Sequence, residues 1–262
     1  PGVHRGLASI LGEHGIPLRA IHGTRDIWCR DYMPIQVDED RFVQFRYAPD
    51  YLAGKYRHLR ADGEIGPALP WIKRCDRSEI VLDGGNVVAR GDRAIVTDKV
   101  YRENAELSRE GVRGALKGVL GLEELIVVPT EPCDPIGHAD GMLCWLGERI
   151  VLINDYSTVG EGFCRRIRSR FDRHQVDLVE LPYEPQSGVR DGIPTAAGNW
   201  MNFLRAGNVL IVPTFELKGD ERALGLLRDL HPGHAVEPVE CRELAEEGGL
   251  LHCVTWQGKL PL

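Results

Sequence analysis

The side chains best suited to chemistry occur in five short segments spread along the chain. These segments are Trp28-Cys29-Arg30-Asp31, Asp83-Gly84-Gly85-Asn86, Gly137-His138-Ala139-Asp140-Gly141, Gly198-Asn199-Trp200-Met201-Asn202 and His252-Cys253. Together they would supply a thiol nucleophile, an imidazole acid or base, three carboxylates and an amide. Neighbouring glycines permit tight turns and a close approach of backbone to a ligand. If the fold brings the segments together, they form a pocket equipped for catalysis.

Taken one at a time, these residues also have ordinary structural explanations. Cys253 lies in an apolar run, where a cysteine is usually an inert core residue. A tryptophan such as Trp28 is also more often a core residue than a substrate contact. Asp83 and Asp140 each precede a glycine, as in common turns. His138 and Asp140 are also ordinary metal ligands, although no second histidine lies at helical spacing from them. A functional site is favoured because all five segments occupy the same place in a repeated pattern.

The repeated pattern is a helix, a short strand and a hairpin, and it recurs roughly every 50 to 60 residues. Apolar residues at three- and four-residue steps predict helices at Val3–His14, Gly66–Cys75, Glu103–Leu120, Gly160–His174 and Asp220–Leu230. Short β-branched runs predict strands at Leu18–Ile21, Glu79–Leu82, Leu125–Val128, Asp177–Leu181 and Ala235–Val239. Alternating runs about polar turns predict hairpins at Tyr32–Tyr47, Asn86–Thr97, Met142–Ile153 and Met201–Pro213, and a single strand at Leu250–Gln257.

Five such repeats predict an α/β fold built as a five-bladed propeller, with residues 1–262 as one domain. Equivalent positions of a closed ring meet at its axis, so the five chemical segments are expected to converge there. A ring usually closes by pairing its two chain ends, and the lone strand Leu250–Gln257 therefore predicts a partner strand before Pro1. The alternative is an α/β sandwich in which strands merely alternate with helices.

The composition excludes several classes of protein. A net charge of −7 argues against a nucleic-acid partner, and no apolar run reaches the length of about 20 residues that spans a bilayer. The acidic balance suits a small cationic substrate. Seven cysteines without a CxxC pair indicate reduced thiols and a cytoplasmic location. Neither cofactor nor metal is called for, and homo-oligomerisation is left open.

The ordered motifs resemble those of the agmatine deiminase and peptidylarginine deiminase family, within the guanidine-modifying (pentein) superfamily. The resemblance rests on five stretches: Trp28 to Pro34, Leu82 to Asn86, Gly137 to Asp140, Asn202-Phe203 leading to Val209–Pro213, and His252-Cys253. It covers nearly the whole chain in order, and it implies a five-bladed α/β propeller. The motifs depart from the family at Tyr32-Met33, at Asp83 in place of Glu and before Cys253, so the identity of the substrate does not transfer.

Carried onto this chain, the resemblance implies that Cys253 attacks the central carbon of a guanidinium group and that His138 shuttles protons. Asp83 would orient His138, while Asp31 and Asp140 would hold the two edges of the guanidinium. Trp28 and Asn202 are expected to contact substrate. Paired carboxylates suit this planar cation, and a neighbouring imidazolium or the bound cation would favour the Cys253 thiolate.

The main hypothesis is hydrolysis of an agmatine-like or arginine-like compound through a covalent thiouronium intermediate. Three alternatives remain at this point: amidino transfer to an amine on the same fold, a catalytically silent propeller that binds a cation or a partner protein, and a metal-dependent hydrolase. The long segment Arg46–Pro70 is expected to roof the entrance. Its basic residues Arg46, Lys55, Arg57 and Arg60 favour a substrate that carries a carboxylate.

Overall fold

The computed structural model describes residues 2–259, which form four three-stranded sheets of one design. In each sheet an antiparallel hairpin is extended by a third strand that runs parallel to the hairpin's second strand. The sheets are β1 (Ile35–Gln36), β2 (Arg41–Arg46) and β3 (Arg74–Val81); β4 (Val88–Arg90), β5 (Arg93–Thr97) and β6 (Glu124–Val128); β7 (Leu143–Trp145), β8 (Ile150–Asn154) and β9 (Asp177–Leu181); and β12 (Leu204–Ala206), β13 (Val209–Thr214) and β14 (Ala235–Glu240). A separate hairpin pairs β10 (Val189–Arg190) with β11 (Ile193–Pro194).

The parallel third strands require crossover connections, and helices supply three of the four. Those helices are α4 (Arg109–Leu120), α5 (Glu161–Arg173) and α6 (Gly219–Leu230). The first sheet instead uses the 3₁₀ segments η1 (Gly54–Glu64) and η2 (Gly66–Ala68). The other helical elements are α1 (Gly2–Glu13), α2 (Cys29–Tyr32), η3 (Gly84–Asn86), α3 (Lys99–Glu103), η4 (Ala139–Gly141), η5 (Tyr156–Thr158) and α7 (Arg242–Ala245).

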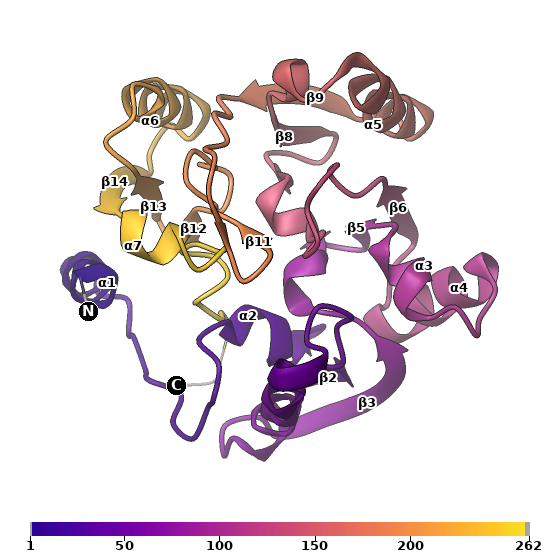
Figure 1. Cartoon of the computed structure of the whole chain (residues 1–262). Coiled ribbons are helices and arrows are strands. Elements are labelled where there is room, and N and C mark those ends of the chain that lie inside the picture. The colour runs from indigo at the N-terminus through magenta and orange to yellow at the C-terminus, as the bar shows by residue number, and fades with distance from the viewer. Residues whose placement is uncertain (1, 260–262) are drawn as a thin grey trace.

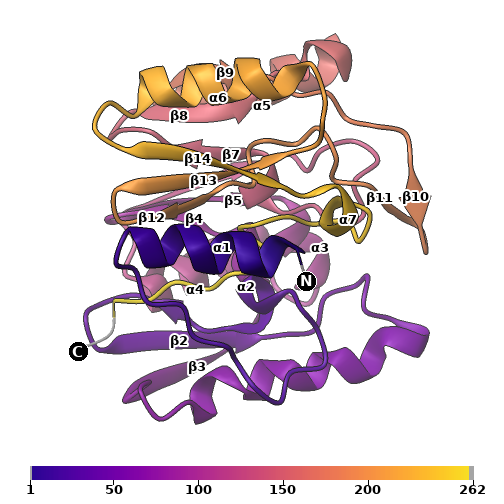
Figure 2. The ribbon, with the colours of Figure 1, turned by 90° about the vertical axis from the view of Figure 1, so that its left-hand side faces the viewer.

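Figure 1 shows the four sheets following one another in chain order around a common centre, with α4, α5 and α6 on the outside. Helix α1 packs against β14, beside the fourth sheet. The perpendicular view places the β10–β11 hairpin and α7 together at one end of the molecule (Figure 2). The segments nearest the centre touch one another, because α2 contacts η3 and η3 contacts η4.

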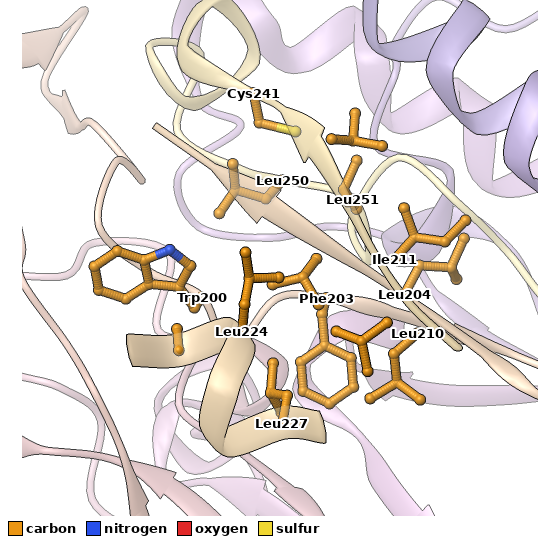
Figure 3. Packing of buried hydrophobic residues seen from close by; sticks show 14 of the residues in the cluster. Trp200, Phe203, Leu204, Leu210, Ile211, Leu224, Leu227, Cys241, Leu250 and Leu251 are labelled. Atoms are coloured by element: carbon orange, nitrogen blue, oxygen red, sulfur yellow. The ribbon is translucent and has the colours of Figure 1, made fainter. Parts of the chain in front are cut away.

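Each sheet is anchored by an apolar core shared with its neighbours. In the fourth sheet, Trp200 is fully buried between the strands and α6, and Leu210, Leu224 and Leu250 pack into the same cluster (Figure 3). The indole Nε1 of Trp200 donates a hydrogen bond to Asp220 Oδ1 at 2.8 Å. This core holds the loop that precedes β12 and the segment that carries Leu250 in fixed positions close to the centre.

Most of the predicted elements are confirmed. All four hairpins are present, as are the helices predicted at 3–14, 160–174 and 220–230 and the strands predicted at 79–82, 125–128, 177–181 and 235–239. The grouping within a repeat differs from the prediction, because each short strand pairs with the hairpin that precedes it. A repeat is therefore a hairpin, a crossover and a third strand.

Three predicted elements are wrong and one is too long. Residues 18–21 form no strand, and the region of the predicted strand Leu250–Gln257 contains turns at residues 251–254. The predicted helix Gly66–Cys75 fails because it contains two prolines, which lack a backbone N–H, and because β3 already begins at Arg74. The predicted helix Glu103–Leu120 begins too early: α3 ends at Glu103 and α4 begins at Arg109, where Ser108 caps the helix by accepting a hydrogen bond from the N–H of Gly111.

Candidate active site

A pocket of about 440 Å³ lies where the central segments meet. The side chains of Asp31, His138, Asp140 and Cys253 line it together, and Asp83 lies fully buried behind His138. These residues come from four segments that are far apart in the sequence. The structure therefore brings together all five residues that were expected to bind and convert a guanidinium.

Local backbone geometry presents the two inner residues of the pocket. Asp83 and His138 each have an extended backbone and directly precede a 3₁₀ turn, η3 or η4. A glycine is required at position 84, where η3 meets α2, because a Cβ atom there would lie 2.0 Å from the carbonyl oxygen of Arg30. The small residues of this motif thus allow two backbone segments to touch beneath the pocket.

His138 is held by two carboxylates. Its Nε2 lies 2.8 Å from Asp83 Oδ2, and its Nδ1 lies 3.4 Å from Asp31 Oδ1. Burial opposes a charge on His138, but Asp31 and Asp83 outweigh burial and raise the pKa of the imidazole to about 9. The ring is therefore an imidazolium at neutral pH, with a proton available for a leaving group.

Asp83 has a cation of its own, Lys99, at its second side. The ammonium Nζ lies 3.0 Å from Asp83 Oδ2, contacts Glu103 as well, and is completely buried. Burial would raise the pKa of Asp83, but Lys99 and His138 outweigh it and hold that pKa below its usual range. Tyr51 closes this network, because its hydroxyl lies 3.4 Å from Asp83 Oδ2 and its ring meets His138 edge to face.

Asp31 and Asp140 converge on the space beside Gly85. A Cβ atom on Gly85 would lie 2.6 Å from Asp31 Oδ1 and 3.2 Å from Asp140 Oδ2, and the N–H of Gly85 donates to Asp31 Oδ1 at 3.0 Å. Burial, with the nearby charges of Asp83 and Asp140, raises the pKa of Asp31 to about 7, against the lowering effect of His138. Two buried carboxylates facing one space form a receptor for a planar cation.

Cys253 lies beside this pair of carboxylates. Its Sγ is 3.9 Å from Asp140 Oδ2. Burial and the charges of Asp140 and Asp31 raise the pKa of the thiol well above its usual range. The expectation that an imidazolium would favour the thiolate is therefore not met in the unliganded site, where the carboxylates dominate. A bound cation would oppose the same two carboxylates and remove their effect on the thiol.

The two residues expected to contact substrate have different surroundings. Trp28 lines the pocket and packs so closely over Gly249 that a Cβ there would lie 2.5 Å from the indole. Asn202 also lines the pocket, but its Oδ1 accepts hydrogen bonds from the backbone N–H groups of His252 and Cys253 at 3.2 and 3.3 Å. Asn202 thus fixes the backbone of the cysteine, a contact that differs from the expected one with substrate.

Cys253 differs from the other cysteines of the chain in its position. Within residues 2–259 no other cysteine lines this pocket. Cys29, which adjoins the Asp31 motif, is buried, and burial raises its pKa to about 12.

Residues 2–259 contain no group of three His, Cys, Asp or Glu side chains arranged to hold a metal ion.

Several residues of the site gave no signal in the sequence analysis. Lys99 lies between the predicted hairpin Asn86–Thr97 and the predicted helix Glu103–Leu120, and Tyr51 belongs to a long irregular segment. Arg30 and His252 stood inside the motifs without a role. His252 Nδ1 lies 2.6 Å from Asp140 Oδ2, and Arg30 Nε donates to the carbonyl oxygen of His252 at 3.2 Å. The position of His252 next to Cys253 was the one available clue.

The segment Arg46–Pro70 does line the mouth of the pocket, through Tyr51, Leu52, Tyr56 and Leu59. Its chemistry differs from the expectation, because Arg46, Lys55, Arg57 and Arg60 are absent from the lining residues. Lys55 pairs with Asp191, and Arg60 donates to the carbonyl oxygen of Pro49. The prediction of a carboxylate-bearing substrate therefore loses its basis.

Opposite this segment, the mouth is formed by the β10–β11 hairpin and by residues 246–249. The hydroxyl of Tyr56 donates to Asp191 Oδ2 at 2.7 Å and connects the two sides. Three acidic side chains line the pocket here, Asp191, Glu246 and Glu247; Asp191 pairs with Lys55, and Glu247 contacts Arg190. An acidic mouth suits a substrate with a second cationic group.

Comparison with known proteins identifies the family of the chain. The model of the Porphyromonas-type peptidyl-arginine deiminases matches residues 16–258. The chain belongs to this family. It is 26% identical to the agmatine deiminase of Pseudomonas syringae pv. tomato, over 91% of this chain and 76% of that protein.

Solved structures share the α/β fold. The agmatine deiminase of Enterococcus faecalis superposes with a TM-score of 0.75 at 22% identity, over 89% of this chain and 74% of that chain. A cysteine-to-serine variant of the C. jejuni agmatine deiminase with substrate bound gives a TM-score of 0.73 at 19% identity, over 87% and 72% of the two chains. The predicted family is thus confirmed.

Proposed function

We propose that this chain is a cysteine-dependent hydrolase that releases ammonia from a small guanidino compound. The observation that carries the proposal is the pocket in which Cys253 Sγ lies 3.9 Å from Asp140, with Asp31 and the His138–Asp83 pair on its other sides. Paired carboxylates bind a guanidinium, a thiol attacks its carbon, and an imidazolium supplies the proton that the leaving amine needs.

The first half of the reaction forms a covalent bond. Asp31 and Asp140 bind the guanidinium and bring its carbon to Cys253, whose proton passes to solvent as the cation offsets the two carboxylates. Attack by the thiolate forms a C–S bond and a tetrahedral adduct. His138 gives its proton to one nitrogen, the C–N bond breaks, and ammonia leaves a thiouronium on Cys253.

The second half regenerates the enzyme. The neutral His138 takes a proton from water, and the resulting hydroxide attacks the thiouronium carbon. The C–S bond then breaks, Cys253 leaves as the thiolate, and the hydroxyl proton of the adduct returns to the thiolate, which restores the thiol and gives a ureido compound. Asp83, itself held by Lys99, keeps His138 oriented through both proton transfers.

We also propose that the substrate carries an amine on its tail. The acidic side chains at the mouth of the pocket would attract an ammonium and repel a carboxylate. Agmatine has this chemistry, and agmatine deiminases are among the relatives of the chain.

The deciding experiment measures ammonia release from agmatine, free arginine, peptidyl-arginine and methylguanidine, with and without an added amine. We expect ammonia from agmatine without an acceptor. Formation of a new guanidino compound from the added amine, with the alkylamine of the substrate released in place of ammonia, would favour amidino transfer. No conversion of any guanidine, with or without the added amine, would favour a binding protein.

We further propose that the four sheets are blades of a single-domain, five-bladed propeller, in which α1 occupies part of the fifth position. The support is the arrangement of the sheets around one centre and the packing of α1 against β14 (Figure 1).

A reducing cytoplasm is proposed from the seven free cysteines. Within residues 2–259, no helix has the length and apolar character needed to cross a bilayer.

A further inference from the structure

The residue next to the proposed nucleophile makes a short contact with one of the proposed guanidinium-binding carboxylates. His252 Nδ1 lies 2.6 Å from Asp140 Oδ2, and only 4% of the Asp140 side chain is exposed. An ionised carboxylate can only accept hydrogen bonds, so Nδ1 carries the proton. Burial would raise the pKa of Asp140, but the hydrogen bond from His252 and the charges of His252, His138 and Arg30 together outweigh burial and hold that pKa below its usual range.

The backbone on both sides of this histidine is fixed. Asn202 Oδ1 accepts from the N–H groups of His252 and Cys253, at 3.2 and 3.3 Å. On the opposite side, Arg30 Nε donates to the carbonyl oxygen of His252 and Arg30 N–H donates to that of Cys253, at 3.2 and 3.1 Å. The imidazole and the thiol therefore have a fixed relative position, and so does the carboxylate that the imidazole holds.

The two oxygens of Asp140 have different surroundings. Oδ2 accepts from His252 and faces Cys253 Sγ, whereas Oδ1 accepts no hydrogen bond from residues 2–259. Oδ2 is also the oxygen that faces Asp31 across Gly85, since a Cβ atom on Gly85 would lie 3.2 Å from Asp140 Oδ2 and 2.6 Å from Asp31 Oδ1. The contact with His252 thus fixes the oxygen that lies between Cys253 and Asp31.

His252 itself is outside that pocket. It lines a second cavity of about 380 Å³, together with Arg30 and Trp256, and Asp140 is the one site carboxylate that lines both cavities. The quarter of the His252 side chain that is exposed therefore faces the second cavity. A substrate would not touch His252, and any effect of this residue on the reaction must pass through Asp140 or the backbone.

We propose that His252 is a positioning residue: its Nδ1–H holds Asp140 in the orientation that places Oδ2 beside Cys253 Sγ, where the carboxylate receives the guanidinium. This inference rests on the proposed function. It assigns to His252 a share of substrate affinity without contact to substrate.

The test is a double-mutant cycle for agmatine binding, measured by calorimetry in the Cys253→Ser protein so that no turnover occurs. His252→Leu removes the donor, whereas His252→Asn places an amide N–H near the position of Nδ1. We expect the Leu variant to bind agmatine about 10- to 100-fold more weakly, as loss of a hydrogen bond to a charged group implies, and the Asn variant to stay within about threefold. When Asp140 is changed to Asn, His252→Leu should cost less than about threefold.

A second measurement separates positioning from folding. The proton spectrum of the unliganded Cys253→Ser protein should contain a downfield imidazole N–H resonance that disappears in both His252→Leu and Asp140→Asn, while the melting temperatures stay within a few degrees. Unchanged agmatine affinity in His252→Leu, or an equal loss whether residue 140 is Asp or Asn, would overturn the inference. If wild type released no ammonia from any guanidine, the proposed function would fail, whereas an active wild type with a normal His252→Leu KM defeats the inference alone.

Discussion

At the scale of single residues, the site is a set of opposed charges that are buried close together. Two buried carboxylates face the pocket, a third holds an imidazolium from behind, and a buried lysine stabilises that third carboxylate. The thiol is next to the two carboxylates that face the pocket, Asp31 and Asp140, and these disfavour its ionisation until a cation binds. Such a site would activate its nucleophile when a guanidinium binds and leave it a thiol otherwise.

Replacement of Cys253 by Ser should separate binding from chemistry. We expect the rate of ammonia release to fall by at least about 10³-fold, because a hydroxyl is a far weaker nucleophile than a thiolate. The Kd for substrate should change by less than about threefold, since Asp31 and Asp140 remain. Cys29→Ser is the matched control, since Cys29 is outside the pocket, and near-normal turnover by Cys253→Ser would exclude covalent catalysis at this residue.

The pH dependence of kcat/KM should be bell-shaped. Asp31, whose pKa is about 7, must be ionised to bind the cation, so activity should fall as the pH drops below about 7. His138, whose pKa is about 9, must be protonated to release ammonia, so activity should fall again above about pH 9. Asp83→Asn removes one of the two carboxylates that raise the pKa of His138, and the alkaline limb should move to lower pH. An alkaline limb that stays in place in this variant would contradict the assignment.

At the scale of elements, the residues of the site lie in or directly beside short helical turns, and glycines allow these turns to pack together. η3 lies between α2 and η4, and its Gly85 occupies the space between Asp31, His138 and Asp140. The helices α4, α5 and α6, which dominate the outline in Figure 1, contribute no residue to the lining of the pocket. Their apolar faces hold the strands, and the strands hold the turns.

Gly85→Ala should inactivate the protein without unfolding it. A Cβ atom there would lie 2.6 Å from Asp31 Oδ1 and 2.8 Å from His138 Nδ1, so both side chains must move from the pocket. We expect kcat/KM to fall by at least about 100-fold, as a misplacement of about 1 Å can cause.

The matched control is Gly114→Ala in α4, where an added Cβ meets nothing within 4 Å. That variant should keep full activity and raise the free energy of unfolding by about 0.5–1 kcal/mol, because alanine favours a helix over glycine. Circular dichroism and urea titration of both proteins make the comparison. Normal activity in Gly85→Ala would show that Asp31 and His138 need not hold these positions.

At the scale of the whole molecule, the site is expected to lower stability at neutral and alkaline pH. The pKa of Asp31 is raised from an ordinary carboxyl value to about 7, so the protonated form that folding favours is lost as the pH rises through that range. The pKa of His138 is raised to about 9, so its contribution is present below about pH 6.5 and lost as the pH rises through about 9. Both groups act in the same direction.

We therefore expect the free energy of unfolding to fall by about 2 kcal/mol or more between pH 5 and pH 9. Asp31→Asn should flatten this dependence, because the amide has no charge to bury. Urea titration at each pH measures the effect, and the exposed Asp40→Asn serves as control. A free energy of unfolding that rises steadily over this range would contradict the assigned pKa shifts.

The amino-acid sequence determined the chemical inventory and the local elements of this protein. The periodicity of apolar residues was sufficient for the hairpins and for helices such as α5 and α6, because these depend on local spacing and on turn residues. It failed at Gly66–Cys75, where prolines exclude a helix, and at Leu250–Gln257, where hydrogen bonds accepted by Asn202 and donated by Arg30 hold a turn around Cys253. It also grouped each short strand with the wrong hairpin, since strand pairing is a long-range contact that local patterns do not encode.

Tertiary structure decided what surrounds each chemical residue, and those surroundings set its properties. From residue type alone, Asp31 would be an ordinary carboxylate and Lys99 an ordinary cation. Burial beside other charges instead raises the pKa of Asp31 to about 7 and makes Lys99 part of the network around His138. The same holds for substrate choice. Basic residues at 46, 57 and 60 suggested a carboxylate, yet packing turns them away from the pocket and places Asp191, Glu246 and Glu247 at its mouth. Electrostatic interactions depend on distance and burial, and only the folded chain determines these.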